Sequence, residues 1–238
     1  MARKAIAETG AAVMNALPLP ARSTQLATFD LLDEAGCEDW VLRVLLMRRH
    51  WRQRHALAPF FTLGLAAYLD CVATAKGRIY DDCALRRSSN ALLDWQFAPL
   101  LQVVAAALSA HFSLPAELTD AGARPGFHIY LPHPAFAMNV AKVHRDLQYR
   151  DVFPGRTTAD DDLFSFTLPL STPSGSGLNL WTDDAAGPDF IPYRSGRLVV
   201  HSGLMRHQAV LDCDGDLERI TLQGHGIRLP GQRLLLYW

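Results

Sequence analysis

The sequence is poor in cysteine and has almost no net charge, and each shortage narrows the class of protein. Its four cysteines, Cys37, Cys71, Cys83 and Cys213, contain no Cys-x-x-Cys pair, so they fit neither a zinc module nor a regular disulfide framework. A chain of 238 residues buries enough surface to fold without disulfides, and reduced thiols in a cytoplasmic protein are expected. The net charge of −1 gives no general attraction toward nucleic acid or membrane.

Long apolar runs are also missing. No stretch of about 18 apolar residues is present, so we expect no transmembrane helix. Met1 to Leu17 resembles a signal peptide only faintly, because Glu8, Gly10 and Asn15 interrupt its apolar part, and we expect no signal there. The composition, 49% hydrophobic and 20% charged, is that of a folded globular protein.

The first half of the chain, residues 1–125, is predicted to be mainly helical. One apolar stripe recurs at spacings of four and three, which indicates a helix: Trp40, Val44, Met47 and Trp51. Phe60 to Val72 is predicted to be a buried helix. Asn90 is predicted to cap a third helix, which Ser113-Leu114-Pro115 ends. The apolar face of this third helix is predicted to comprise Leu93, Phe97, Leu100, Val104 and Leu108.

From residue 126 onward the apolar period changes to two, and turn-rich stretches separate short apolar runs. The predicted strands are Phe127–Leu131, Val140–Val143, Leu163–Leu170, Leu178–Trp181, Leu198–His201, Gln208–Leu211, Ile220–Leu222 and Leu234–Trp238. This number of short strands indicates a sandwich or a jelly-roll, cupin-like barrel (a double-stranded β-helix). We therefore predict an α+β protein, in which residues 126–238 form a jelly-roll core and the N-terminal helices of residues 1–125 buttress it as one compact unit.

A set of metal-ligating residues follows the strand pattern. His144 and Asp146 are two apart, and on a strand this spacing points both side chains to one face. His207 follows a turn-like link after a predicted strand, and Arg219 follows twelve residues later. A His-x-Asp tripeptide has little meaning alone. Two imidazoles and a carboxylate, however, form the facial ligand set of non-haem Fe(II), and arginine binds a carboxylate through two nitrogens.

These stretches resemble the Fe(II)/2-oxoglutarate-dependent oxygenases. The similar segments are Asn139 to Asp146, Gly196 to His207, and Arg219-Ile220-Thr221. The resemblance covers roughly residues 126–238 and identifies no subfamily. It implies that His144, Asp146 and His207 bind Fe(II). It also implies that Arg219, helped by Thr221, holds the far carboxylate of the cosubstrate 2-oxoglutarate. Asn139 is predicted to contact the cosubstrate as well.

The resemblance implies a dioxygenase that uses O2 and releases succinate and CO2. The expected substrate is a small molecule, such as an amino acid or natural-product intermediate, which is hydroxylated; desaturation and ring formation remain alternatives. Asp146 disfavours the halogenases, which lack this carboxylate, and His225 stands where the nucleic-acid repair branch has a second arginine. Two other interpretations stay open, namely a hydroxylase of peptide or protein side chains and a cupin-like metal- or sugar-binding barrel without oxygenase activity.

Some assignments have alternatives within the sequence. His201 could replace His207 as the metal ligand, and Arg197 or Arg206 could replace Arg219 as the carboxylate partner. Candidate substrate contacts are Tyr149, Arg206 and His225.

Two polar segments are open to a functional and a plain interpretation. The segment Tyr149 to Asp162 is either an active-site lid or a solvated loop. The basic cluster Arg48 to Arg54 is predicted to be a solvated helix rather than a nucleic-acid surface. Neither the substrate nor the oligomeric state follows from the sequence.

Overall fold

The computed structural model describes residues 26–75, 77–183, 187–230 and 232–238. The question of a signal peptide at residues 1–17 lies outside these ranges. In chain order the described helices and strands are β1 (Leu26–Asp30), α1 (Glu34–Leu46), β2 (Arg52–Gln53), β3 (Phe60–Leu63), α2 (Ala67–Asp70), β4 (Ala73–Thr74), β5 (Gly77–Arg78), α3 (Cys83–Phe112), β6 (Ala116–Leu118), β7 (Gly126–Tyr130), α4 (Tyr149–Val152), β8 (Leu163–Ser171), β9 (Gly177–Trp181), β10 (Asp189–Pro192), β11 (Arg197–Ser202), β12 (Arg206–Val210), β13 (Arg219–Leu229) and β14 (Arg233–Tyr237). Short 3-10 turns occur at Arg48–His50, Ile79–Asp81, Pro134–Ala137 and Asp160–Asp162.

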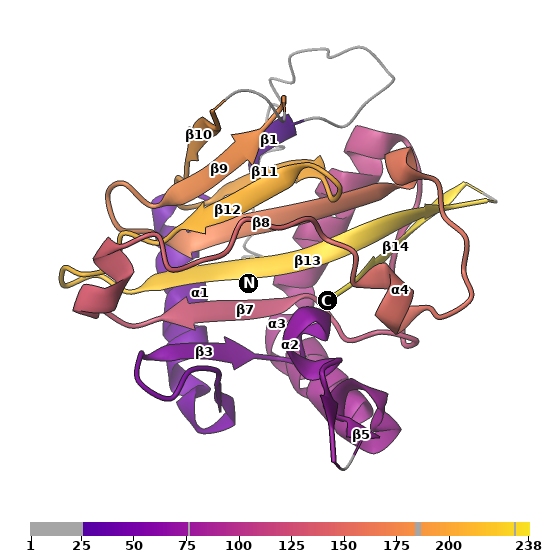
Figure 1. Cartoon of the computed structure of the whole chain (residues 1–238), viewed down its shortest axis with the longest axis horizontal. Coiled ribbons are helices and arrows are strands. Elements are labelled where there is room, and N and C mark those ends of the chain that lie inside the picture. The colour runs from indigo at the N-terminus through magenta and orange to yellow at the C-terminus, as the bar shows by residue number, and fades with distance from the viewer. Residues whose placement is uncertain (1–25, 76, 184–186, 231) are drawn as a thin grey trace, which may run out of the picture.

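Two mainly antiparallel sheets form the centre of the molecule (Figure 1). The large sheet has the order β1-β11-β8-β13-β7-β3-β2, with β14 beside β13 and β6 beside β14. The small sheet has the order β10-β9-β12. The chain passes repeatedly from one sheet to the other, since β8, β11 and β13 lie in the large sheet while β9, β10 and β12 lie in the small one. The predicted α+β class is confirmed, and the strands are mainly antiparallel.

The two faces of the large sheet have different chemistry because alternate residues of a strand point to opposite sides. On β8, Phe164, Phe166 and Leu168 belong to the main apolar core, whereas Ser165 and Thr167 between them do not. On β13, Ile220 and Leu222 likewise join the core, and the alternate residues are polar. One face therefore packs against apolar side chains, and the other carries the polar groups of the candidate site.

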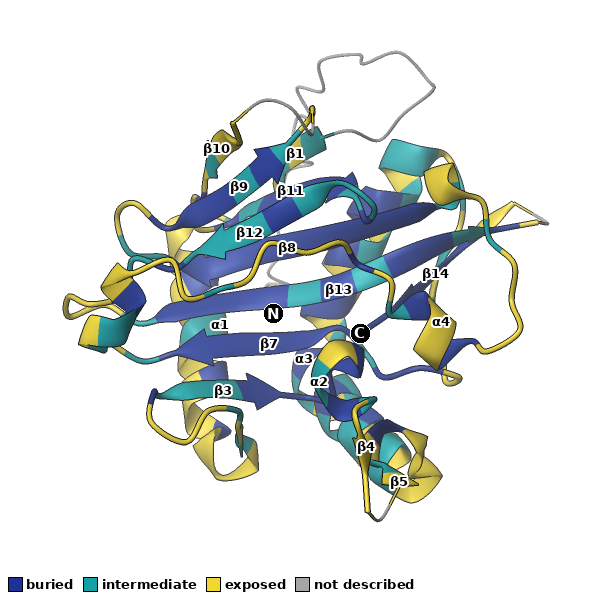
Figure 2. Ribbon diagram, in the orientation of Figure 1, coloured by how far each residue is buried: buried dark blue, intermediate teal, exposed yellow. Residues whose placement is uncertain are grey.

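Helices α1 and α3 cover the apolar face of the large sheet (Figure 2). Asp82 caps α3 by accepting hydrogen bonds from the Ala84 and Leu85 amides, and the helix ends at Ser113, which has the left-handed φ of 54°. The predicted apolar face of this helix is confirmed, because Leu93, Phe97, Leu100, Val104 and Leu108 are all buried in the core. By length and mean hydropathy α3 resembles a membrane span, but core helices pass the same test, and the apolar face of α3 packs in the main core.

The Gly224-His225-Gly226 stretch of β13 follows from the same packing. A Cβ atom at Gly224 would overlap the ring of Phe166, and one at Gly226 would overlap the ring of Phe164. Glycine at these two positions lets the phenylalanines of β8 lie directly on β13. The side chain of His225 between them consequently points to the polar face.

Several predicted elements are wrong. Phe60 to Val72 is not one helix, because Phe60–Leu63 pairs with β7 as strand β3 and only Ala67–Asp70 is helical. Val140–Val143 is not a strand. Asn90 does not cap a helix but lies inside α3, where its amide donates to the Gly122 carbonyl and accepts from the Arg124 amide.

The basic cluster is not a solvated helix either. Arg48–His50 is a 3-10 turn and Arg52–Gln53 belongs to β2. Arg54 forms two hydrogen bonds of 2.7 Å with the buried Asp70. Strands β1, β2, β3 and β6 of the first half also join the large sheet, which the periodicity of that half did not indicate. The division of the chain at residue 126 stays a prediction.

Candidate active site

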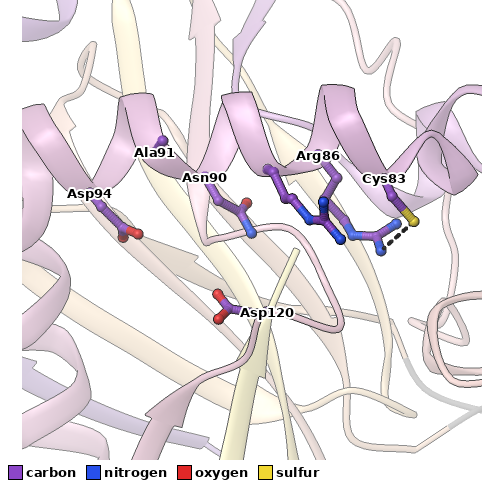
Figure 3. Close-up of a pocket in the computed structure, with 7 residues that line it drawn as sticks. Cys83, Arg86, Asn90, Ala91, Asp94 and Asp120 are labelled. Carbon is purple, nitrogen blue, oxygen red and sulfur yellow. Dashed lines mark hydrogen bonds between the residues drawn. The ribbon is translucent and has the colours of Figure 1, made fainter.

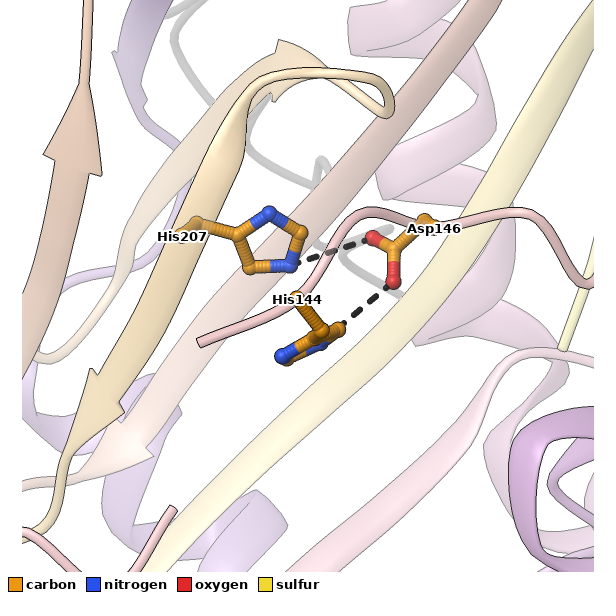
Figure 4. A group of neighbouring side chains, drawn as sticks. All are labelled: His144, Asp146 and His207. Carbon is orange, nitrogen blue, oxygen red and sulfur yellow. Dashed lines mark ion pairs between the residues drawn. The ribbon is translucent and has the colours of Figure 1, made fainter. Parts of the chain in front are cut away.

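Two imidazoles and one carboxylate converge between the sheets (Figure 4). His207 lies on β12, and His144 joins the edge of the small sheet through a two-way backbone bridge to His207. The Asp146 amide donates to the Gly203 carbonyl at 2.7 Å, which holds the carboxylate beside the imidazoles. His144 and Asp146 are thus brought together by an extended coil and not by the predicted strand.

The spacing of the ligand atoms suits one metal ion. Nε2 of His144 lies 3.5 Å from Oδ1 of Asp146, and Nε2 of His207 lies 3.3 Å from Oδ2. Ligands about 2.1 Å from one ion and at right angles to each other lie about 3 Å apart. The three ligand atoms all lie within 4.8 Å of one another. His144 is largely exposed and Asp146 and His207 are buried, so the group has one open side.

The backbone orients both imidazoles toward this point. Nδ1 of His144 lies 2.8 Å from the Lys142 carbonyl, and Nδ1 of His207 lies 2.8 Å from the Met205 carbonyl. A carbonyl can only accept, so Nδ1 carries the proton in each ring and Nε2 keeps its lone pair. Metal-binding histidines are commonly oriented in this way.

The charges of the group favour its ionised carboxylate. Burial alone would raise the pKa of Asp146, but the facing His207, His225 and His144 rings hold it well below its usual value. Burial would lower the pKa of His207, and the Asp146 carboxylate outweighs this and raises it. Protons on the imidazoles and the carboxylate compete with a divalent cation for the same ligand atoms. Metal affinity is therefore expected to fall with acidification.

Arg219 is a buried cation without an acidic partner in the part of the chain that the structure describes. The residue is fully buried, and its Nε donates to Oγ of Ser176 at 2.8 Å. Its Nη1 and Nη2 atoms are buried and have no hydrogen-bond partner among the described residues. The rings of Tyr130 and Tyr193 lie 5.4 and 5.3 Å from its Cζ atom. An unpaired buried charge is costly, and two free nitrogens in one plane fit a carboxylate. The residues present therefore fit an anionic cosubstrate.

The alternative metal ligand, His201, is not one of the three converging residues, and the alternative carboxylate partners, Arg197 and Arg206, have other contacts. His201 is buried with its ring 4.6 Å from that of His207, but it is not part of the converging group, and burial lowers its pKa to about 3. Arg197 pairs with Asp30 through two nitrogens at 2.7 and 3.0 Å. Arg206 stacks over Trp181, and as the neighbour of His207 on β12 it faces the opposite side of the strand.

The remaining predicted residues are placed as follows. Thr221 is fully buried on the same face of β13 as Arg219. Asn139 is exposed, and no described hydrogen bond joins it to Arg219 or to the metal-ligating group. Tyr149 is buried in a second apolar cluster that also contains Tyr237. The cosubstrate role of Asn139 and the substrate role of Tyr149 stay predictions, as does a lid at residues 149–162.

Four polar contacts of the site were not foreseen. Ser165 donates to the Asp146 carboxylate, Ser176 accepts from Arg219, and Tyr130 and Tyr193 flank the guanidinium. Ser165 carries a sequence signal, because it is a polar residue within the alternating apolar pattern of β8. Ser176 and Tyr193 lie outside the predicted strands, and only the fold brings them to Arg219.

A separate hollow of about 370 Å³ lies on helix α3 (Figure 3). Asn90 and Asp94 contribute to its lining, together with Cys83, Arg86, Arg87 and Asp120. Asn90 bonds to the backbone, and Asp94 and Asp120 pair with Arg124. Its acidic and amide groups therefore have partners within the protein. Helix α3 covers the apolar face of the sheet, so this hollow is not part of the metal-ligating group.

Comparisons with known proteins agree with this geometry at the level of the fold. No protein-family model matches the sequence, and no curated protein matches it. An N-substituted L-amino acid dioxygenase from Burkholderia ambifaria AMMD is similar in structure, with a TM-score of 0.56, 10% identity and coverage of 90% of this chain and 86% of that one. Its complex with alpha-KG gives the same TM-score and coverage at 11% identity. The chain has the fold of the 2-oxoglutarate/Fe(II) oxygenases.

A second enzyme of similar structure is an alpha-ketoglutarate-dependent epimerase. It is the non-heme alpha-ketoglutarate-dependent epimerase SnoN from nogalamycin biosynthesis, with a TM-score of 0.52, 12% identity and coverage of 90% of this chain and 94% of that one. The similarity thus spans both halves of the chain and not only residues 126–238.

Proposed function

We propose that this protein is an Fe(II)- and 2-oxoglutarate-dependent dioxygenase that hydroxylates a small molecule. The observation that carries the proposal is Arg219 on β13, a buried guanidinium whose Nη1 and Nη2 atoms have no partner among the described residues. It lies on the polar face of the large sheet, the face from which Ser165 contacts Asp146 of the metal-ligating group. A cupin-like barrel that binds only a metal or a sugar has no use for such a cation. A 2-oxoglutarate-dependent enzyme needs one for the far carboxylate of its cosubstrate.

In this proposal the protein supplies binding and orientation. His144 and His207 present their Nε2 lone pairs and Asp146 one carboxylate oxygen to Fe(II), in the facial arrangement that leaves positions open. Fe(II) and 2-oxoglutarate, when bound, would supply the oxidation of the substrate by O2, with release of succinate and CO2. Arg219 would hold the far carboxylate through Nη1 and Nη2, while Ser176 fixes Nε and Thr221 lies beside it.

Two tyrosine rings favour a charged Arg219, and hence a bound carboxylate, at this buried position. The two tyrosine faces stabilise the cation and exclude water from it.

We propose further that the two sheets form a double-stranded β-helix buttressed by α1 and α3. The small-molecule class is supported by the substrate named for the Burkholderia dioxygenase, an N-substituted L-amino acid. We propose a cytoplasmic location and no nucleic-acid or membrane partner.

The test is direct. Purified protein is incubated in air with Fe(II), ascorbate and labelled 2-oxoglutarate, and succinate that forms without an added substrate is measured. We expect slow succinate formation in wild type and none in His207→Ala. Absence of turnover together with absence of 2-oxoglutarate binding under anaerobic conditions would contradict the proposal.

A further inference from the structure

Two side chains of the large sheet lie next to the carboxylate of Asp146. Ser165 on β8 and His225 on β13 are directly opposite each other in the antiparallel register. The Ser165 hydroxyl donates to Oδ2 of Asp146, and its Oγ lies 3.0 Å from Nδ1 of His225. Nδ1 of His225 is itself 3.6 Å from Oδ2, which is too long for a direct hydrogen bond.

The hydrogen-bond inventory of serine fixes the direction of this chain. A hydroxyl has a single hydrogen, and here it is given to the carboxylate. Ser165 must then accept from His225, so Nδ1 of His225 carries a proton. The chain therefore runs from His225 through Ser165 to Oδ2 of Asp146, and every member of it is buried or nearly so.

The two oxygens of Asp146 are consequently unequal. Oδ2 accepts a charge-assisted hydrogen bond from Ser165, whereas Oδ1 has a longer contact of 3.3 Å from Nε2 of Gln148. Each oxygen faces one imidazole, Oδ1 that of His144 at 3.5 Å and Oδ2 that of His207 at 3.3 Å, so the hydroxyl of Ser165 is what distinguishes the two oxygens. A hydroxyl that already occupies a lone pair of Oδ2 weakens that oxygen as a metal ligand. Oδ1 stays available for the ion.

We propose that Ser165, oriented by His225, is a positioning residue that makes Asp146 bind the metal through one oxygen only. The proposal rests on the metal-binding part of the proposed function. One-oxygen binding matters because a facial set leaves three positions, two for the keto acid and one for O2. A carboxylate that bound through both oxygens would occupy one of the three and compete with the cosubstrate.

The test measures metal binding rather than activity. Mn(II) and Co(II) affinities are determined by titration for wild type, Ser165→Ala and Ser171→Ala. Ser171 is the matched control, because it is a buried serine of the same strand whose hydroxyl donates to the Glu218 carbonyl. Loss of groups that orient metal ligands costs about 10–100-fold in metal affinity, so we expect that loss in Ser165→Ala and none in Ser171→Ala.

A spectroscopic readout separates positioning from general loosening. In Ser165→Ala the visible spectrum of bound Co(II) should change, because the freed Oδ2 enters the coordination sphere. Anaerobic 2-oxoglutarate binding to the Co(II)-loaded variant should weaken. The same affinity and the same Co(II) spectrum in Ser165→Ala and wild type would overturn the proposal.

Two variants of His225 decide the matter if Ser165→Ala does not fold. His225→Asn keeps an N–H group near the position of Nδ1, whereas His225→Ala removes it. We expect Co(II) affinity close to wild type in His225→Asn and weaker in His225→Ala; equal affinities in the two would overturn the proposal. Wild type that binds Co(II) but not 2-oxoglutarate would defeat the proposed function, and the affinity comparisons would still decide the role of Ser165.

Discussion

Among single residues, Arg219 is the one that we propose binds the far carboxylate of 2-oxoglutarate. Arg219→Ala removes both free nitrogens, and hydrogen bonds to charged groups contribute about 1.5–3 kcal/mol. We therefore expect the dissociation constant for 2-oxoglutarate to rise by about 10–100-fold, with little change for Fe(II). The measurement is anaerobic titration of the metal-loaded variant. An equal loss of affinity for the metal and for 2-oxoglutarate would contradict a carboxylate-binding role of Arg219.

The choice between two neighbouring histidines is also made at the residue scale. His207→Ala removes the ring whose Nε2 lies 3.3 Å from Asp146, so we expect Co(II) binding to be lost. His201→Ala leaves the three converging ligand atoms in place, and we expect Co(II) binding to persist. Titration of both variants under the same conditions checks this. The reverse result would move the ligand to His201.

At the scale of elements, helix α3 stabilises the large sheet, which carries Arg219, Ser165 and His225 of the site. Phe97 is fully buried on this helix and packs against Phe127 of β7, with ring centroids 4.6 Å apart. We expect Phe97→Ala to lower the free energy of unfolding by about 3–5 kcal/mol. Trp95→Ala is the control on the same helix, since Trp95 is 71% exposed, and it should change stability by less than about 0.5 kcal/mol. Urea unfolding of the metal-free proteins gives both values.

At the scale of the whole molecule, the buried histidine His128 links folding to pH. Burial, with a smaller contribution from the Arg219 charge, lowers its pKa well below 6.5, so the folded protein keeps it neutral. The unfolded chain protonates it below pH about 6.5, and this residue alone should lower stability there by about 1.4 kcal/mol per pH unit. Urea unfolding of the metal-free protein at pH 7.5, 6.5 and 5.5 checks the slope.

The variant His128→Gln is the control for this pH dependence. Glutamine does not titrate, and its amide reaches the position of Nε2, which bonds to the Tyr68 hydroxyl at 2.7 Å. The variant should therefore lose less stability than wild type between pH 6.5 and 5.5. Equal slopes would assign the effect to other groups.

The sequence predicted what depends on local chemistry and on periodicity. Alternating apolar residues predicted β8, because Phe164, Phe166 and Leu168 occupy one face of a strand whatever its partners are. Spacings of three and four predicted the buried face of α3 for the same reason. His144, Asp146, His207 and Arg219 were chosen from residue type and order alone, and the structure gathers the first three.

Tertiary structure decided what depends on contacts between distant segments. Phe60–Leu63 is a strand and not a helix because β7 offers it a partner, which no local pattern reveals. The hydrogen bond from Ser165 to Asp146 and that from Arg219 to Ser176 join residues 19 and 43 positions apart. The sequence by itself determined which residues can bind a metal and a carboxylate. Only the tertiary structure decided that these residues lie together. Arg219 is buried with no partner for Nη1 and Nη2 among the described residues, and this depends on how the strands pack and not on the local sequence.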